Sequence, residues 1–126
     1  MPSKCVFCGI VSGRMASHIV WEDSEFLAIL DFNPLKPGHT LLIPKKHVEY
    51  VFDLPEPLYS KLFQTAKQVA AVMKKNSNAK RIGISIEGFL VPHICIHLVP
   101  INRENELLPK RSHVIDEQGG TTIFKR

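Results

Sequence analysis

The sequence predicts an α+β fold in which one long helix covers an antiparallel sheet of about five strands, with a short helix at the N-terminus. Short β-branched and aromatic runs stand on both sides of a single long amphipathic segment. The first runs are separated only by brief turn signals, as in antiparallel sheets. No repeat, low-complexity tract or linker divides the 126 residues. We therefore expect one domain spanning residues 1–126, with a polar tail from about residue 103.

A short helix and three strands are predicted in the first third of the chain. Within residues 5–12, a helical turn would place Val6, Phe7 and Ile10 on one side. Runs at 19–22 and 26–31 flank a hairpin signal at 23–25. Turn residues at 33–38 then precede a third run at 40–43, which Pro44 ends.

The long helix is expected from about Pro55 to Asn76. Apolar side chains recur there at spacings of three and four and share one face, namely Leu58, Leu62, Ala66, Val69 and Met73. A proline at the start of a helix is tolerated because the first N–H groups have no intrahelical partner. Two more strands are expected at 82–86 and 94–99, which gives the order β-β-β-α-β-β.

Composition and charge limit the classes of function. Hydrophobic residues make up 44% and charged residues 22% of the chain, which is ordinary for a soluble globular protein. No run approaches the roughly 20 apolar residues that span a bilayer, and the start lacks the apolar core of a signal peptide. We therefore expect a cytoplasmic protein without a membrane partner. The net charge of +4 suits an anionic ligand but is too small to indicate nucleic acid.

The three cysteines indicate chemistry rather than a disulfide framework, because their number is odd and no secretion signal precedes them. Metal binding and catalysis are the two uses that remain.

One segment near the C-terminal end places two histidines around a cysteine. A strand sends alternate side chains to opposite faces, so His93, Cys95 and His97 would share one face at a Cα spacing of about 7 Å. A lone histidine is usually a surface residue or a satisfied core residue. Two histidines that flank a cysteine on an otherwise apolar strand favour contact with a ligand, a metal or solvent, because an unpartnered polar face is costly.

These residues are part of a larger pattern that resembles the histidine-triad (HIT) family, in particular its Hint-like branch. The resemblance covers roughly residues 5–102 and includes four blocks in matching order and spacing: Cys5-Val-Phe-Cys8-Gly-Ile, Phe26-Leu-Ala-Ile-Leu-Asp31, Pro37-Gly-His39-Thr-Leu-Leu-Ile-Pro-Lys-Lys-His47 and Pro92-His93-Ile-Cys95-Ile-His97-Leu-Val-Pro100. It implies a nucleotide-binding α+β fold, usually a homodimer. It also implies hydrolysis or transfer at the α-phosphorus of nucleoside phosphoramidates or related nucleotides, with a purine nucleotide such as AMP or GMP as partner.

The resemblance also implies a role for each matching residue. His93 and His97 would orient the nucleophile and protonate the phosphate or leaving group, with His39 near the phosphates. Asp31 would accept hydrogen bonds from the ribose hydroxyls, for which an acceptor-only carboxylate is suited. An apolar slot for the base is implied at Phe7, Ile10, Ile29 and Phe32, and plain core packing is the alternative interpretation of these four.

Cys95 stands where the family's middle histidine attacks the α-phosphorus. Three interpretations remain open: a working nucleophile whose pKa is lowered by two flanking imidazoles, a natural loss that leaves a nucleotide sensor, or an engineered substitution that disables the enzyme.

The loop before the triad is a second departure from the family pattern. Many Hint-like members carry Gly-Gln-Ser or Gly-Gln-Thr there, and Gly88-Phe89-Leu90-Val91 replaces it in this chain. The hydroxyl contact with the phosphate is therefore lost, and a backbone N–H near Val91 is expected to serve in its place.

Cys5-x-x-Cys8 alone is weak support for a metal, since a redox pair or a chance occurrence is comparably frequent. Some bacterial Hint-like members bind structural zinc with two such cysteines, the histidine that ends Pro-Lys-Lys-His, and the first triad histidine. These correspond to Cys5, Cys8, His47 and His93. Two thiolates and two imidazoles form the closed tetrahedral set of a structural zinc site. The alternative is a reduced, metal-free cysteine pair.

The sequence therefore predicts a HIT-type hydrolase or transferase that acts on a purine nucleotide and is impaired by Cys95. A non-catalytic nucleotide-binding protein is the second interpretation. A zinc-stabilised interaction protein is the third, which would explain the cysteine pair but not Asp31, His39 or His97.

Overall fold

The computed structural model describes residues 5–107, so most of the predicted polar tail lies outside the described residues. The elements follow the predicted order. They are α1 (Val6–Val11), β1 (Ile19–Glu22), β2 (Phe26–Leu30), β3 (Thr40–Pro44), a short 3₁₀ turn (Val51–Asp53), α2 (Leu58–Lys75), β4 (Arg81–Ser85) and β5 (Ile96–Ile101).

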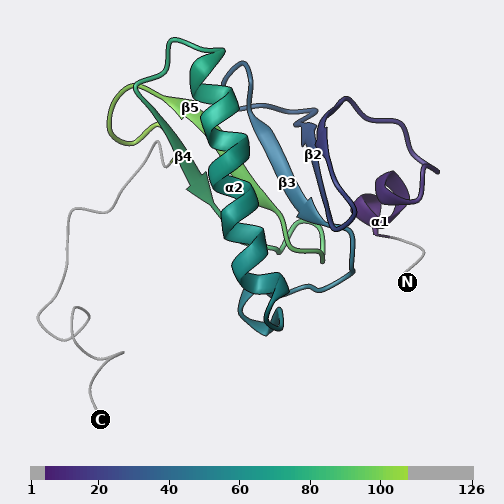
Figure 1. Cartoon of the computed structure of the whole chain (residues 1–126). Helices are drawn as coiled ribbons and strands as arrows, with labels where there is room; N and C mark the ends of the chain where they lie inside the picture. Colours follow the sequence, from purple (N-terminus) through teal and green to yellow (C-terminus); the bar gives the residue numbers. More distant parts are fainter. Residues whose placement is uncertain (1–4, 108–126) are drawn as a thin grey trace, which may run out of the picture.

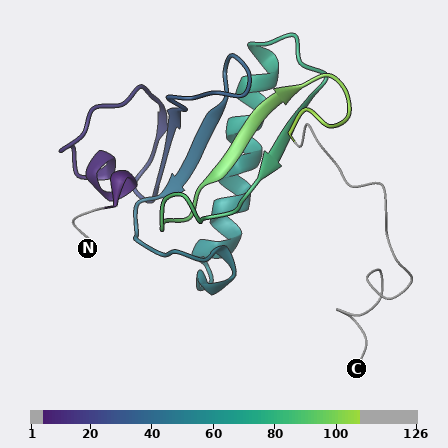
Figure 2. The same cartoon turned by 180° about the vertical axis from the view of Figure 1, so that it is seen from behind.

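The five strands form one antiparallel sheet in the order β1-β2-β3-β5-β4 (Figures 1 and 2). The first hairpin turns at the predicted residues, where Asp23 Oδ1 accepts the backbone N–H groups of Glu25 and Phe26 at 2.8 and 2.7 Å. The predicted fold class, α+β with one long and one short helix, is confirmed.

The central strands are buried on both faces, which explains why their sequences are continuously apolar rather than alternating. One apolar layer lies between the sheet and α2 and includes Phe26, Ala28, Leu42, Ile96 and Leu98. The opposite layer packs against α1 and includes Leu27, Ile29, Leu41, Ile43 and Cys95. The strands thus hold α2 on one side and leave the other side for α1 and a pocket.

The long helix packs through the predicted face. Leu62, Ala66 and Val69 are buried against the sheet, and Figure 1 shows α2 lying across it. The helix begins at Leu58 rather than at the expected Pro55. Glu56 accepts the backbone N–H of Ser60 at 2.9 Å and its hydroxyl at 2.8 Å, which satisfies one free donor of the first turn.

The last strand begins two residues later than predicted. It was expected from residue 94, but β5 starts at Ile96, so His93 and Cys95 precede the regular ladder. The reason is that two backbone N–H groups here bond elsewhere: the His93 N–H donates to Val91 O, and the Ile94 N–H donates to the distant Val48 O, both at 2.8 Å. Alternation of faces still holds, because Ile94 and Ile96 face α2 while Cys95 faces the opposite layer.

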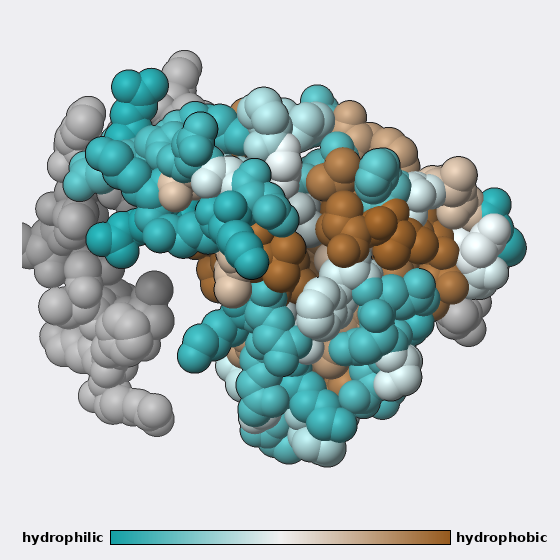
Figure 3. All heavy atoms as spheres, turned by 45° about the horizontal axis from the view of Figure 1, so that its top comes forward, coloured by the Kyte–Doolittle hydropathy of each residue, from teal (hydrophilic) through white to brown (hydrophobic). Residues whose placement is uncertain are grey.

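An apolar groove of about 460 Å³ lies between the C-terminal half of α2, β1 and the turn before β3. Val20, Trp21, Val72 and Met73 are among its lining residues. Apolar side chains gather on the face that carries this end of the helix (Figure 3). Across residues 5–107, no helix is long and apolar enough to cross a membrane.

Candidate functional site

A pocket of about 470 Å³ opens on the sheet face opposite α2, where the β2–β3 turn meets the β4–β5 loop. This volume is typical of small-molecule sites. Eight predicted site residues line it: Phe7, Asp31, Phe32, His39, Val91, His93, Cys95 and His97. Ile10 and Ile29, also predicted for the base slot, are absent from its walls. They lie in the buried layer around α1, as their alternative interpretation of core packing expects.

Strand pairing brings together three polar groups that are distant in sequence. The register of β3 and β5 pairs Leu41 with His97, and His39 lies two residues before Leu41 on the same side. Its Nε2 is 3.0 Å from His97 Nδ1. The Asp31 N–H donates to the His39 carbonyl at 3.0 Å, and the Asp31 Oδ2 lies 3.4 Å from His39 Nε2. These three groups form a connected chain in the pocket.

Hydrogen bonds fix the tautomers of the two histidines in this group. The Leu35 N–H donates to His39 Nδ1 at 3.0 Å, so a neutral His39 carries its proton on Nε2 and donates it to His97 Nδ1. The proton of a neutral His97 is then on Nε2, which is left to donate within the pocket. Burial lowers the pKa of His39 more than Asp31 raises it, which keeps the His39 ring neutral.

Cys95 contributes a buried, protonated thiol to this pocket. Its side chain is 4% exposed, and burial, together with the charge of Asp31, raises the thiol pKa to about 12. Within residues 5–107, no hydrogen bond joins its sulfur to either flanking histidine. The lowered pKa expected for a working nucleophile is therefore wrong, because desolvation outweighs any effect of the imidazoles.

A second cluster lies beside the pocket, between α1, the end of β3 and the bend before β5. It contains the four residues predicted as metal ligands, Cys5, Cys8, His47 and His93. The His93 Nδ1 lies 3.4 Å from the Cys5 sulfur and 3.6 Å from the Cys8 sulfur. The His47 Nδ1 lies 3.1 Å from the Cys8 sulfur and 3.2 Å from His93 Nδ1. All four donor atoms lie within 4.8 Å of one another.

His93 makes its ring contacts with this cluster rather than with the hydrogen-bonded group of Asp31, His39 and His97. Its Nε2 is 2.7 Å from the Pro44 carbonyl, which accepts the ring proton and leaves the Nδ1 lone pair facing the two sulfurs. Both ring nitrogens are thus engaged, and the catalytic role of His93 stays a prediction. Such a second hydrogen bond to a backbone carbonyl is typical of metal-ligating histidines.

The donor set fits a tetrahedral zinc ion. Zinc bonds of about 2.0–2.1 Å to nitrogen and 2.3 Å to sulfur require ligand atoms about 3.3–3.8 Å apart, close to the distances above. Burial and the neighbouring Cys5 raise the pKa of the Cys8 thiol. A divalent cation would offset this effect and lower the thiol pKa, because it stabilises adjacent thiolates.

Asp31, His39 and His97 are spaced as metal ligands often are, but the tautomer of His39 does not suit a metal ligand. Its three donor atoms also lie within 4.8 Å of one another. A neutral histidine that ligates through Nε2 must carry its proton on Nδ1. The Leu35 N–H already points at the Nδ1 of His39, so this position has no room for a proton. The group is therefore arranged for hydrogen bonding rather than for a metal.

Three features of the two sites were not predicted. The Leu35 N–H and the Pro44 carbonyl are backbone groups, and no side-chain pattern in the sequence indicates them. The third feature is Glu49, whose carboxylate lies 3.9 Å from His47 Nε2. Its position two residues after His47 is the sequence signal that could have indicated this contact.

Comparison with known proteins agrees with this geometry. Residues 12–104 match the HIT domain family model. An uncharacterised HIT-like protein of Methanocaldococcus jannaschii is 33% identical over 105 residues, which cover 76% of this chain and 78% of that protein. The adenosine 5′-monophosphoramidase of Saccharomyces cerevisiae is 31% identical over 101 residues, covering 79% of this chain and 64% of the yeast protein. The chain belongs to the HIT family.

Two solved structures extend the comparison to the fold and the metal. A HIT family protein from Bacillus anthracis superposes with a TM-score of 0.81 at 29% identity, covering 98% of this chain and 89% of the other. A zinc-bound histidine triad protein from Mycobacterium smegmatis has a TM-score of 0.75 at 32% identity, covering 93% and 88%. The resemblance to the HIT family is therefore confirmed.

Proposed function

We propose that this protein binds a purine nucleoside monophosphate, such as AMP or GMP, in the pocket between the β2–β3 turn and the β4–β5 loop. The hydrogen bond between the His39 and His97 rings, with the Asp31 carboxylate beside them, is the observation that carries the proposal. Asp31 offers a carboxylate acceptor for ribose hydroxyls. On the other side of His39, His97 offers an imidazole N–H donor for a phosphate oxygen. Phe7 and Phe32 supply apolar surface for the base.

The reaction proposed for this site is hydrolysis at the α-phosphorus of a phosphoramidate or related nucleotide. The net reaction adds the OH of one water to phosphorus, breaks the bond from phosphorus to the leaving nitrogen or oxygen, and gives the remaining proton of that water to the leaving group. His97 is suited to supply that proton, and His39 is a positioning residue that holds its tautomer. Cys95 makes this chain a slow enzyme, because its protonated thiol is a poor nucleophile.

A nucleotide sensor without turnover is the second candidate function. The buried Cys95, without a hydrogen bond to a base within residues 5–107, favours it. The two functions share one binding site and differ only in the rate at which bound nucleotide is cleaved.

The role of Asp31 gives a direct test of the binding site. We expect Asp31→Ala to weaken AMP binding by about 1–3 kcal/mol, because hydrogen bonds to a charged group are lost. Isothermal titration calorimetry measures this. Asp31 Oδ1 also accepts the Asn33 N–H at 2.9 Å, so Asp31→Asn, which keeps an acceptor for that turn, is the matched control. We expect Asp31→Asn to weaken binding as well. Unchanged affinity in both variants would remove Asp31 from the site.

We also propose that Cys5, Cys8, His47 and His93 hold one structural zinc ion. The ion would supply a fixed cross-link between α1, the end of β3 and the bend before β5. The spacing of the four donors and the hydrogen bond from His93 to Pro44 support this proposal. With four protein ligands no coordination position stays open, so the ion would have no direct part in the reaction.

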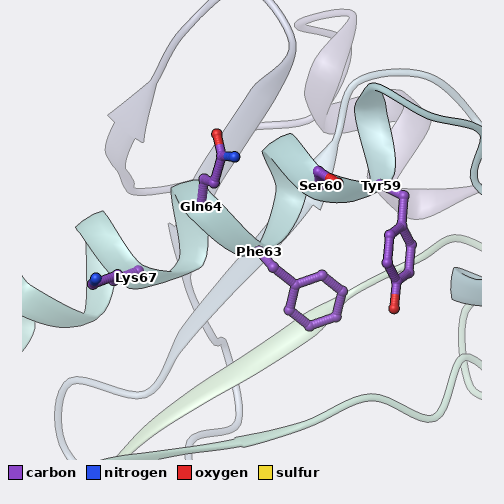
Figure 4. A pocket seen from close by; sticks show the side chains of 5 residues that line it. All are labelled: Tyr59, Ser60, Phe63, Gln64 and Lys67. Carbon is purple, nitrogen blue, oxygen red and sulfur yellow. The ribbon is translucent and has the colours of Figure 1, made fainter.

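A homodimer is the third proposal. Among the described residues, β4 is the edge strand and pairs only with β5, so its outer side is free for a second copy. Along the first turns of α2, a shallow hollow is lined by Tyr59, Ser60, Phe63, Gln64 and Lys67 (Figure 4). The rings of Tyr59 and Phe63 offer apolar surface for such an interface.

Introducing a charge in this hollow tests the dimer. We expect the unaltered chain to sediment with the mass of two chains and Phe63→Glu to sediment as a monomer, because a buried unpaired carboxylate destabilises an interface. Val20→Glu, on β1 at the other edge of the sheet and 48% exposed, is the control and should remain dimeric. A monomeric unaltered chain would contradict the proposal.

A further inference from the structure

Two almost fully exposed apolar side chains lie at the rim of the nucleotide pocket. Phe89 is 92% exposed and Leu90 is 99% exposed, and both line the pocket. Single exposed apolar residues are common, but an adjacent pair of this size at the rim of a pocket offers a large apolar contact surface to a bound ligand.

The loop that carries this pair has a defined backbone. Gly88 has a φ of +81°, which is favourable only for glycine, and an added Cβ would lie 3.2 Å from the Glu49 carbonyl. On the other side of the pair, the His93 N–H donates to Val91 O at 2.8 Å. Phe89 and Leu90 are therefore held between two fixed points.

The charges around the pocket restrict which ligand groups can pack on Phe89 and Leu90. The described lining of the pocket includes the carboxylates of Asp31 and Glu87 but no lysine or arginine. Phosphate groups are usually held by arginine or lysine, which supply charge-assisted hydrogen bonds. A leaving group that carries phosphates of its own would lie near Glu87 without a matching cation. An uncharged group faces no such penalty.

We propose that the group attached to the α-phosphate of the ligand is uncharged and apolar, an aromatic or branched aliphatic group, and that it packs on Phe89 and Leu90. The proposal rests on the nucleotide site proposed above and narrows its substrate class. Ligands with an aryl or alkyl substituent on the phosphate are preferred, and those with a further phosphate are disfavoured. The same two residues stand where the sequence lacks the expected hydroxyl side chain.

Calorimetry with four ligands tests this preference: AMP, ADP, and the methyl and benzyl phosphate esters of AMP. The two esters carry the same charge, so their affinity ratio isolates the apolar contact. We expect the benzyl ester to bind at least about tenfold more tightly than the methyl ester, and ADP to bind more weakly than either. In the double variant Phe89→Ser, Leu90→Ser, the ratio should fall to about one.

Phe52→Ser is the matched control, because Phe52 is 67% exposed and lies outside the pocket lining. It should keep the full benzyl preference. A benzyl-to-methyl ratio near one in the unaltered chain, or a ratio that survives in the double variant, would overturn the proposal while leaving AMP binding intact. Tighter binding of ADP than of the benzyl ester would also overturn it. Failure of all four ligands to bind would overturn the proposed nucleotide site together with this inference.

Discussion

Replacing Cys95 with histidine is expected to raise the rate of adenosine phosphoramidate hydrolysis by at least about 100-fold, which corresponds to roughly 2.7 kcal/mol of barrier. A thiol with a pKa of about 12 is almost entirely protonated at pH 7, so its sulfur is a weak nucleophile. An imidazole at the same place has a free nitrogen lone pair at neutral pH and can attack phosphorus. The measurement is kcat/KM of the two proteins with the same substrate.

A second substitution separates the nucleophile from the proton donor. His97→Ala in the Cys95→His background should remove part of the gain, because proton transfer typically contributes about 10² to 10⁴ in rate. Thermal unfolding of each variant checks that the larger ring is accommodated, since Cys95 is 4% exposed. If the unaltered chain already hydrolyses the substrate as fast as Cys95→His, the slow-enzyme proposal is wrong. Cys95→Ala then distinguishes a competent thiol from a bystander.

Removing zinc is expected to destabilise the fold by about 4 kcal/mol when free zinc exceeds its dissociation constant about 1,000-fold. The reason is that a metal which binds only the folded state stabilises that state by mass action. The measurement is the free energy of unfolding in urea with and without zinc, together with elemental analysis. We expect one zinc per chain.

Two cysteine variants make this test specific. Changing Cys5 and Cys8 together to serine should abolish both bound zinc and the zinc-dependent stabilisation. Cys95→Ser, a change at the third buried cysteine, should retain both. Zinc retained by the Cys5 and Cys8 double variant would show that the proposed ligand set is wrong, and a replete protein with well under one zinc per chain would show that the site is not a zinc site.

Much of the fold could be predicted from the sequence because its signals are local. The helical spacing of Leu62, Ala66 and Val69 predicted the buried face of α2, and Asp23 marked the first hairpin. The late start of β5 could not be predicted, because it depends on a hydrogen bond between Ile94 and Val48, 46 residues earlier in the chain.

The site was less predictable than the fold, because the roles of its residues depend on burial and on backbone groups. His93 was expected in both sites, and its bond to the carbonyl of Pro44, which turns Nδ1 toward the two sulfurs, could not be read from the sequence. Cys95 faces the pocket as the alternation of side chains predicts, although it lies just before β5. Its raised pKa follows from how tightly the surrounding layer packs, which no residue spacing reveals.

The nucleotide site itself is tested most directly by a crystal structure of the chain with AMP. We expect the ribose hydroxyls within about 2.7–3.2 Å of the Asp31 carboxylate and a phosphate oxygen at the same distance from His97 Nε2. The base should lie against Phe7 and Phe32. AMP bound in the apolar groove beside Trp21, or bound in the pocket with its phosphate away from His39 and His97, would contradict the site.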